Sequence, residues 1–204
     1  TFETQLGGSS STSFNDTFIS FKEIVPQEKN ADVVPNSVQH NVPAWTLFAI
    51  FFIMVPLSIN IVKEKNQGTY LRLISSPTSN SVLYLGKIIT YLIICLLQFY
   101  TILIIAKLVF PYMNLPELNL SIKKIALMSL LTLTAGLAAI GMGILLGIVS
   151  KTQEQSAPFG ATFVIILAAV GGVWIPVFAM SETMQIASKT SPMNWALNGY
   201  YDIM

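Results

Sequence analysis

Charged side chains are scarce in this chain of 204 residues. Only 10% of its residues are Asp, Glu, Lys or Arg, whereas 53% are hydrophobic. A typical soluble domain carries about 25% charged residues, which cover its surface with groups that bind water. A surface that faces lipid needs no such groups. The composition therefore excludes a soluble globular protein and indicates a membrane protein.

Cysteine and histidine are almost absent too. Cys95 is the only cysteine and His40 the only histidine, so a disulfide within the chain is excluded and a zinc site lacks ligands. We interpret Cys95, which lies in an apolar run, as a small buried or lipid-facing side chain. The net charge of +1 provides no field that would attract nucleic acid, so we expect no nucleic-acid partner.

Motifs for catalysis and for phosphate binding are missing as well. The patterns HExxH, GxSxG and GxxxxGK[ST] do not occur, so we expect no enzyme activity, no bound cofactor and no ATP site on this chain. The apolar runs described below contain no acidic residue and no histidine, which an ion-coupled carrier would need at mid-depth. Lys107 lies near the end of its run, where its side chain can reach the headgroups, and we assign it no transport role.

Four apolar runs have the length of a membrane-spanning helix, which is about 20 residues. They cover residues 44–62, 88–110, 125–149 and 159–178. Lipid offers the backbone no hydrogen-bond partner, so each run should be a helix. We therefore predict an all-α polytopic membrane protein whose transmembrane domain covers residues 43–204.

The distribution of basic residues predicts the orientation. Four crossings place both ends of the chain on one side of the membrane, and basic loops stay in the cytoplasm. The basic residues of the two sides are Lys63, Lys65, Arg72, Lys87 and Lys151 on one and Lys123, Lys124 and Lys189 on the other. We therefore predict a cell-membrane protein with residues 63–87 in the cytoplasm and residues 179–204 outside. The polar residues 1–42, with a serine-rich patch, would be the C-terminal end of an extracytoplasmic domain.

Small residues recur at every fourth position of the third run. They are Ala135, Ala139, Gly143 and Gly147. Such residues line one helix face and let a neighbouring backbone approach closely. Packing within the chain is the simpler interpretation, and a subunit contact or a substrate path is the alternative. Asn60 and Gln98 are amides inside the runs, which either bond to a neighbouring helix or line a transport pathway.

The segment between the first two runs combines charge with helical spacing. A charged cluster follows the first run, and Tyr70, Leu71, Leu73 and Ile74 then form an apolar face. Ser76-Pro77 ends this helix, because proline disfavours the helical conformation of its predecessor. Ser79 or Ser81 can cap the next helix. We predict a short amphipathic helix joined tightly to two spans, with a plain headgroup loop as the alternative.

These residues resemble a known signature. The pattern Glu64-Lys65-x-x-Gly68-Thr69, followed by Leu71-x-Leu73, Ser76-Pro77 and Gly86-Lys87, is similar to that of type-2 ABC exporter permeases. The later pattern Gly171-Gly172-x-Trp174-x-Pro176, with Ser191-Pro192-x-x-Trp195, looks like the fifth span and outer re-entrant helices of that family. The resemblance covers roughly residues 42–204.

The resemblance implies a six-span permease in which the four runs are spans two to five. A cytoplasmic ATPase subunit, which binds ATP and Mg, would dock on Glu64, Lys65, Gly68, Thr69, Leu71 and Leu73. The outer re-entrant region would include Pro176, Pro192 and Trp195. The partners would be this ATPase, a second permease subunit that completes a dimer, and the lipid bilayer. The function would be ATP-driven export of a drug, a lipid or a glycolipid-like molecule.

Two other classes of function remain open at this stage. A non-transporting scaffold or assembly subunit would have the same apolar runs. An ion-coupled secondary carrier is the third class, which the lack of embedded acidic groups disfavours. The long polar lead-in of residues 1–42 argues against the branch of the superfamily that carries a fused ATPase.

Overall fold

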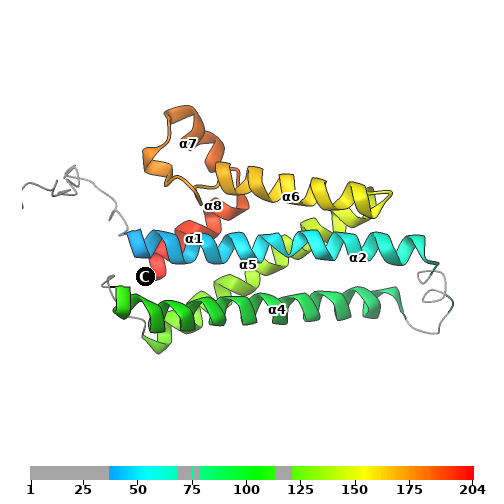
Figure 1. The fold of residues 1–204 in the computed structure, drawn as a ribbon, viewed down its shortest axis with the longest axis horizontal. Helices are drawn as coiled ribbons and strands as arrows, with labels where there is room; N and C mark the ends of the chain where they lie inside the picture. The colour runs from blue at the N-terminus through cyan, green and yellow to red at the C-terminus, as the bar shows by residue number, and fades with distance from the viewer. Residues whose placement is uncertain (1–36, 69–74, 76–78, 114–120) are drawn as a thin grey trace, which may run out of the picture. The chain divides into compact units, whose positions relative to one another are not determined.

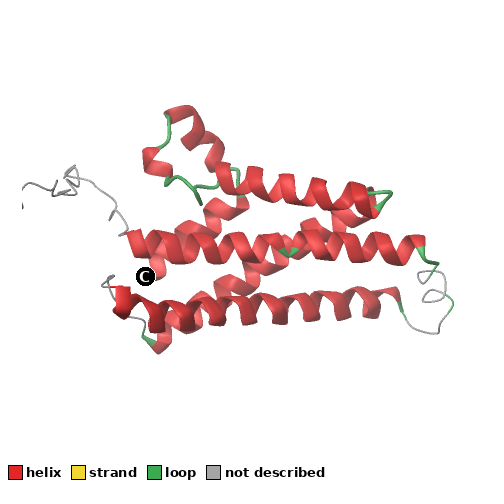
Figure 2. Ribbon diagram, viewed as in Figure 1, coloured by secondary structure: helices red, strands yellow, loops and turns green. Residues whose placement is uncertain are grey.

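The computed structural model describes residues 37–68, 75, 79–113 and 121–204, all of which belong to the unit Pro35–Met204. Within these residues every regular element is a helix (Figures 1 and 2). In chain order they are α1 Ser37–Phe52, α2 Met54–Asn66, α4 Asn80–Val109, η1 Phe110–Met113, α5 Ile122–Val149, α6 Gln153–Val170, η2 Val177–Ala179, α7 Glu182–Ser188 and α8 Pro192–Ile203. The predicted all-α class is confirmed. The interpretation of residues 1–42 falls mostly outside the described residues, although α1 already begins at Ser37.

Among the described residues, three stretches are long and apolar enough to cross a membrane. They are Val38–Asn66, Ser81–Tyr112 and Ile122–Val149, with 29, 32 and 28 residues. At about 1.5 Å of rise per residue, each is longer than the hydrocarbon core of a bilayer, which is about 30 Å thick. They correspond to the first three predicted runs and extend beyond them, because polar residues continue the helices past the apolar middle.

The first stretch is one helix with a break at Ile53. Pro56 has no N–H to bond to the Phe52 carbonyl, so the regular ladder is interrupted there. The Ile53 N–H instead bonds to the Ile50 carbonyl at 3.3 Å, a tighter turn than that of an α-helix. Figure 2 shows this point as a short loop between α1 and α2. Pro43, the first residue of the predicted transmembrane domain, lies inside α1.

The predicted bounds of the fourth span, residues 159–178, are wrong. Helix α6 begins earlier, in polar sequence, and ends at Val170. Gly172 follows with a φ of +86°, a left-handed conformation that other residues rarely adopt and that commonly ends a helix. Residues 173–178 are apolar but contain only the start of the short helix η2. Helix α6 is accordingly not among the three stretches that meet the length and composition of a span.

Helix α5 is the centre of the packing, since it contacts α1, α2, α4, α6 and α8. The largest fully buried side chains lie around it and include Leu47, Phe51, Met54, Leu57, Met128 and Ile140. Helix α4 joins this core through few residues, such as Cys95 and Phe99. Only 11% of its apolar stretch is buried within the chain. An apolar helix that is this exposed is suited to lipid or to another membrane subunit.

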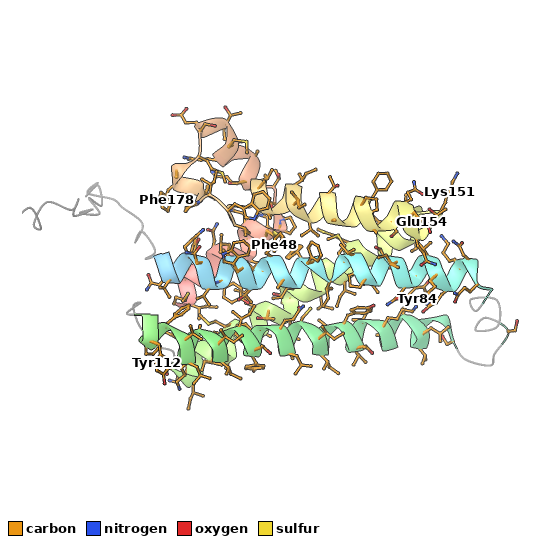
Figure 3. All side chains as sticks on the ribbon, in the orientation of Figure 1. Phe48, Tyr84, Tyr112, Lys151, Glu154 and Phe178 are labelled. Atoms are coloured by element: carbon orange, nitrogen blue, oxygen red, sulfur yellow. The ribbon has the colours of Figure 1, made fainter. Side chains whose placement is uncertain are left out.

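The two ends of the helix bundle carry different side chains. Figure 3 places Tyr84, Lys151 and Glu154 at one end and Tyr112 at the other. The first end, where α2 and α5 finish and α4 and α6 begin, is called the Lys151 end below. The opposite end is called the Tyr112 end.

Candidate functional site

The last turn of α2 makes polar contacts with three other elements at the Lys151 end. Glu64 forms an ion pair with Lys87 of α4. Lys65 donates from Nζ to the carbonyl of Ile148, in the last turn of α5, at 2.8 Å. Asn66 donates from Nδ2 to the carbonyl of Lys151, in the turn between α5 and α6, at 3.1 Å. We call Glu64, Lys65 and Asn66 the terminal tripeptide.

Helix geometry explains why three consecutive residues contact different elements. Successive side chains of an α-helix are about 100° apart around its axis, so three of them span more than half a turn. A helix end surrounded by α4 on one side and by α5 and α6 on the other can therefore contact each neighbour with a separate residue. The charged cluster of the sequence thus belongs to the membrane-crossing helix itself and connects it to its neighbours.

Lys65 donates a hydrogen bond to a carbonyl of α5 that has no N–H partner within its own helix. The last four carbonyls of an α-helix have no N–H partner within the helix. In α5, the Leu146 carbonyl accepts from the Ser150 N–H at 3.0 Å, and the Ile148 carbonyl accepts from Lys65. A cation is also favoured at the negative end of the helix dipole. Lys65 therefore acts as a C-terminal cap that is supplied by another helix.

The turn that Asn66 contacts is fixed by its own hydrogen bonds. Thr152 is the N-cap of α6 and accepts from the Gln155 N–H at 3.2 Å. The Gln155 side chain in turn accepts from the Lys151 N–H at 3.1 Å. This is close to the capping box, in which a Thr and a Gln three residues later satisfy each other's backbone groups. The turn that contains the Lys151 carbonyl is thus fixed to the start of α6.

Gly68 follows the C-terminal cap of α2 and has the conformation that commonly ends a helix. It has a φ of +69°, the left-handed conformation that favours glycine after a helix end. The segment after Gly68 is the one for which the sequence predicts an amphipathic helix. Thr69, Leu71 and Leu73, the other residues predicted to couple to an ATPase, lie outside the described residues. At the other end of this segment, Ser79 caps α4 and accepts from the Ser81 N–H at 3.3 Å.

The small-residue face of α5 is buried inside the chain, and its two glycines lie against α2. All four of its members, Ala135, Ala139, Gly143 and Gly147, are buried. A Cβ atom added at Gly143 would lie 3.1 Å from the Met54 Cα atom, and one added at Gly147 would lie 2.8 Å from the Ile61 Cβ atom. The two backbones are therefore in close contact, as small residues permit. This geometry agrees with packing within the chain, the simpler of the two interpretations.

Asn60 and Gln98, predicted to bond to a neighbouring helix or to line a transport pathway, differ in their surroundings. Asn60 donates to the Tyr91 hydroxyl at 2.7 Å and so links α2 to α4. The Oε1 atom of Gln98 is buried and has no hydrogen-bond partner among the described residues. A role of either residue in a transport pathway stays a prediction.

The Tyr112 end contains the residues predicted for the outer re-entrant region. Pro176 precedes η2, and Pro192 is the first residue of α8, a position that suits proline because no helical N–H is needed there. Trp195 is 63% exposed and donates from Nε1 to the Lys189 carbonyl at 2.6 Å. These residues shape the segment that turns from α6 through α7 into α8 (Figure 1).

Two contacts of α8 were not foreseen from the sequence. The His40 Nδ1 atom of α1 is hydrogen-bonded to the Tyr201 hydroxyl. Thr132 of α5 donates to the Met128 carbonyl at 2.7 Å, so the Tyr200 hydroxyl, 2.6 Å away, donates to Thr132. Burial raises the pKa of Tyr200 to about 12. Together these bonds attach α8 to α1 and α5.

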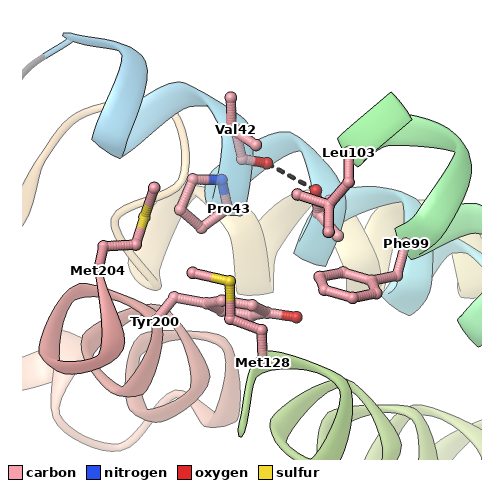
Figure 4. A pocket seen from close by; sticks show the side chains of 8 residues that line it. Val42, Pro43, Phe99, Leu103, Met128, Tyr200 and Met204 are labelled. Carbon is pink, nitrogen blue, oxygen red and sulfur yellow. Dashed lines mark hydrogen bonds between the residues drawn. The ribbon is translucent and has the colours of Figure 1, made fainter. Parts of the chain in front are cut away.

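A small cavity lies between α1, α4, α5 and α8 (Figure 4). Its volume is about 10 Å³, and its lining includes Val42, Phe99, Met128 and Tyr200. Both hydroxyls of the lining are already bonded, since that of Thr46 donates to the Val42 carbonyl at 2.6 Å and that of Tyr200 donates to Thr132. A space of this size holds about one water molecule and cannot hold a transported molecule.

Comparison with known proteins identifies the family. The model of a family described as ABC-2 family transporter protein matches residues 3–204. The chain belongs to the ABC-2 transporter family. This match confirms the resemblance carried by the Glu64–Thr69 signature, and together with the long apolar helices it makes the chain a membrane protein.

Two curated relatives of this ABC-2 chain are permeases. The linearmycin resistance permease protein LnrN of Bacillus subtilis (strain 168) is 26% identical over 160 residues, which are 77% of the chain and 40% of the relative. The probable multidrug ABC transporter permease YbhR of Escherichia coli (strain K12) is 27% identical over 143 residues, 69% of the chain and 36% of the relative. The chain thus spans about two fifths or less of the length of these relatives. No solved structure matches it.

Proposed function

We propose that the chain is part of the permease subunit of an ATP-driven exporter, in which a partner ATPase pulls on the end of α2. The observation that carries the proposal is the position of the family signature. Glu64 and Lys65 lie at the end of a long apolar helix, where they contact α4 and α5. A force applied just beyond Gly68 would therefore reach several membrane helices at once. ATP and Mg would be bound by the ATPase, and two permease subunits would form the pathway.

The proposal requires that the Lys151 end faces the cytoplasm and that the protein lies in the cell membrane. The basic residues at that end support this orientation. Gln67 is exposed there, and Tyr112 is 91% exposed at the opposite end. In whole cells, a membrane-impermeant maleimide should label Tyr112→Cys, and it should label Gln67→Cys only after the cells are permeabilised. Cys95 is buried and adds little background.

Labelling of Gln67→Cys in intact cells would contradict the proposal, because no cytoplasmic ATPase could then reach this end. The label at Tyr112→Cys is the matched control, since it shows that the reagent and the protein are both present at the cell surface.

The partner is tested by purifying the full-length permease. An ATPase should co-purify in a fixed ratio, and Glu64→Ala should lower ATP-driven efflux. Glu154→Ala is a matched control, because this carboxylate is exposed at the same end and has no bonded partner among the described residues. A permease that recruits no ATPase would favour the scaffold function. Efflux that survives ATP depletion and stops when the ion gradient is removed would favour a secondary carrier.

We propose a drug, a lipid or a glycolipid-like molecule as the substrate. The names of the relatives, a linearmycin resistance permease and a probable multidrug permease, support this class. Expression of the full-length transporter should raise the concentration of linearmycin or of ethidium that stops the growth of a sensitive host. Equal sensitivity with and without the transporter would remove these two compounds as substrates.

A further inference from the structure

We propose that Lys65 and Asn66 are positioning residues that carry movement of α2 to α5 and α6, by holding the turn between those helices against the end of α2. The inference rests on the proposed function, in which an ATPase moves the segment beyond Gly68. It adds which membrane helices receive that movement, and through which atoms.

The two bonds attach to backbone groups that cannot move independently of their helices. Lys65 binds the Ile148 carbonyl, which is part of the last turn of α5. Asn66 binds the Lys151 carbonyl, and the residue that carries it is fixed to the first turn of α6 by Gln155. A displacement of the end of α2 therefore shifts the C-terminus of α5 and the N-terminus of α6 together.

Because Lys65 and Asn66 are exposed, their role in transmitting movement can be distinguished from a role in stability. Both side chains are exposed, and exposed polar contacts add little to the stability of a fold. The stable contact between α2 and α5 lies deeper, where Gly147 meets Ile61 and Ser58. Loss of the Lys65 bond should therefore leave the helices packed and free only their ends.

Glu64 provides a separate connection to α4. Its ion pair with Lys87 shares no atom with the bonds of Lys65 and Asn66. The end of α2 thus has one connection to α4 and another to the turn between α5 and α6. Removal of the Lys87 charge should separate the start of α4 from the end of α2, while the bond of Asn60 to Tyr91 and the connection to that turn stay intact.

The test uses the full-length permease with its co-purified ATPase in lipid nanodiscs. Spin labels on Gln67→Cys and Glu154→Cys, both exposed positions, report the distance between the end of α2 and the start of α6. With the native Lys65, addition of ATP and vanadate should leave this distance distribution narrow and its mean unchanged. In Lys65→Met and in Asn66→Ala, the same addition should broaden the distribution and shift its mean.

Two variants control for charge and chemistry. Lys63→Met removes the same charge two residues away. The Lys63 side chain has no bonded partner among the described residues, so this variant should behave like the unchanged protein. Lys65→Arg keeps a donor that can reach a carbonyl and should restore the narrow distribution. Thermal unfolding of Lys65→Met and Asn66→Ala should stay close to that of the unchanged protein, which a purely structural role would not predict.

The outcomes distinguish the inference from the function on which it rests. A distribution in Lys65→Met and Asn66→Ala that stays as narrow as in the unchanged protein would overturn the inference and leave the exporter function standing. A permease that co-purifies with no ATPase would overturn the exporter function and the inference with it.

Discussion

Substitution of Gly147 by alanine tests the contact between α5 and α2. The added Cβ atom would lie 2.8 Å from the Ile61 Cβ atom and 3.1 Å from the Ser58 carbonyl oxygen. Distances below 3.0 Å are essentially never seen for a Cβ atom. Since the Ile61 Cβ atom is bonded directly to the backbone, no side-chain rotation can relieve the contact. Helix α2 itself has to move away.

The expected loss of stability in Gly147→Ala follows from two opposing effects. Extra volume in a packed interior destabilises a protein by about 1–3 kcal/mol. Alanine is favoured over glycine within a helix by roughly 0.5–1 kcal/mol, which offsets part of that loss. We therefore expect Gly147→Ala to lower the free energy of unfolding by about 1–2 kcal/mol.

The same helix offers a matched control. A Cβ atom added at Gly141 would have nothing within 4 Å, so Gly141→Ala changes only the helix preference. We expect Gly141→Ala to be as stable as the unchanged protein or slightly more stable. Reversible unfolding in mixtures of detergent and SDS measures both variants. If Gly147→Ala proves as stable as Gly141→Ala, the close contact between α5 and α2 is wrong.

Three further predictions concern other elements. Tyr200→Phe removes the bond to Thr132 and should lower the free energy of unfolding by about 1 kcal/mol in the same assay, whereas unchanged stability would mean that the bond adds nothing. Cys95 is fully buried, so it should react with a maleimide only after SDS denatures the protein, and fast reaction in the folded state would contradict its place in the core. Pro56→Ala restores an N–H that can bond to the Phe52 carbonyl, so the backbone amides around Ile53 should exchange their hydrogens more slowly; unchanged exchange would exclude proline as the cause of the break.

The sequence predicts the long helices because lipid leaves the backbone no other solution. Their middle parts were placed correctly, but α1 and α4 begin at Ser37 and Asn80, several residues before the apolar runs. Hydropathy detects only the part of a helix that lies in hydrocarbon. The polar turns that continue the helix into the headgroups are set by caps such as Ser79, which the sequence did suggest.

The end of α6 was missed for a different reason. Residues 171–178 are apolar, so they extended the predicted run beyond Val170, where the helix ends. The signal that was overlooked is the pair Gly171-Gly172, since glycine readily adopts the positive φ found at Gly172. The start of α6 was likewise recognisable from Thr152 and Gln155, which have the spacing of a capping box.

The partners of the terminal tripeptide could not be read from sequence. Lys65 and Asn66 bond to residues 83 and 85 positions away along the chain. Such pairs depend on how α5 crosses α2, and no local pattern encodes that crossing. The acceptors are moreover backbone carbonyls, which every residue has, so the identity of residues 148 and 151 carries no signal.

The bond of Lys65 depends on the close contact at Gly147. Gly147 precedes Ile148 directly, and its missing side chain lets the last turn of α5 approach α2 closely enough for the Lys65 ammonium to reach a carbonyl at 2.8 Å. A methyl group at position 147 should push that carbonyl away and break the bond. The double variant Gly147→Ala with Lys65→Met should therefore broaden the distance distribution between α2 and α6 no further than Gly147→Ala alone. Additive broadening would show that the packing and the polar contact act independently.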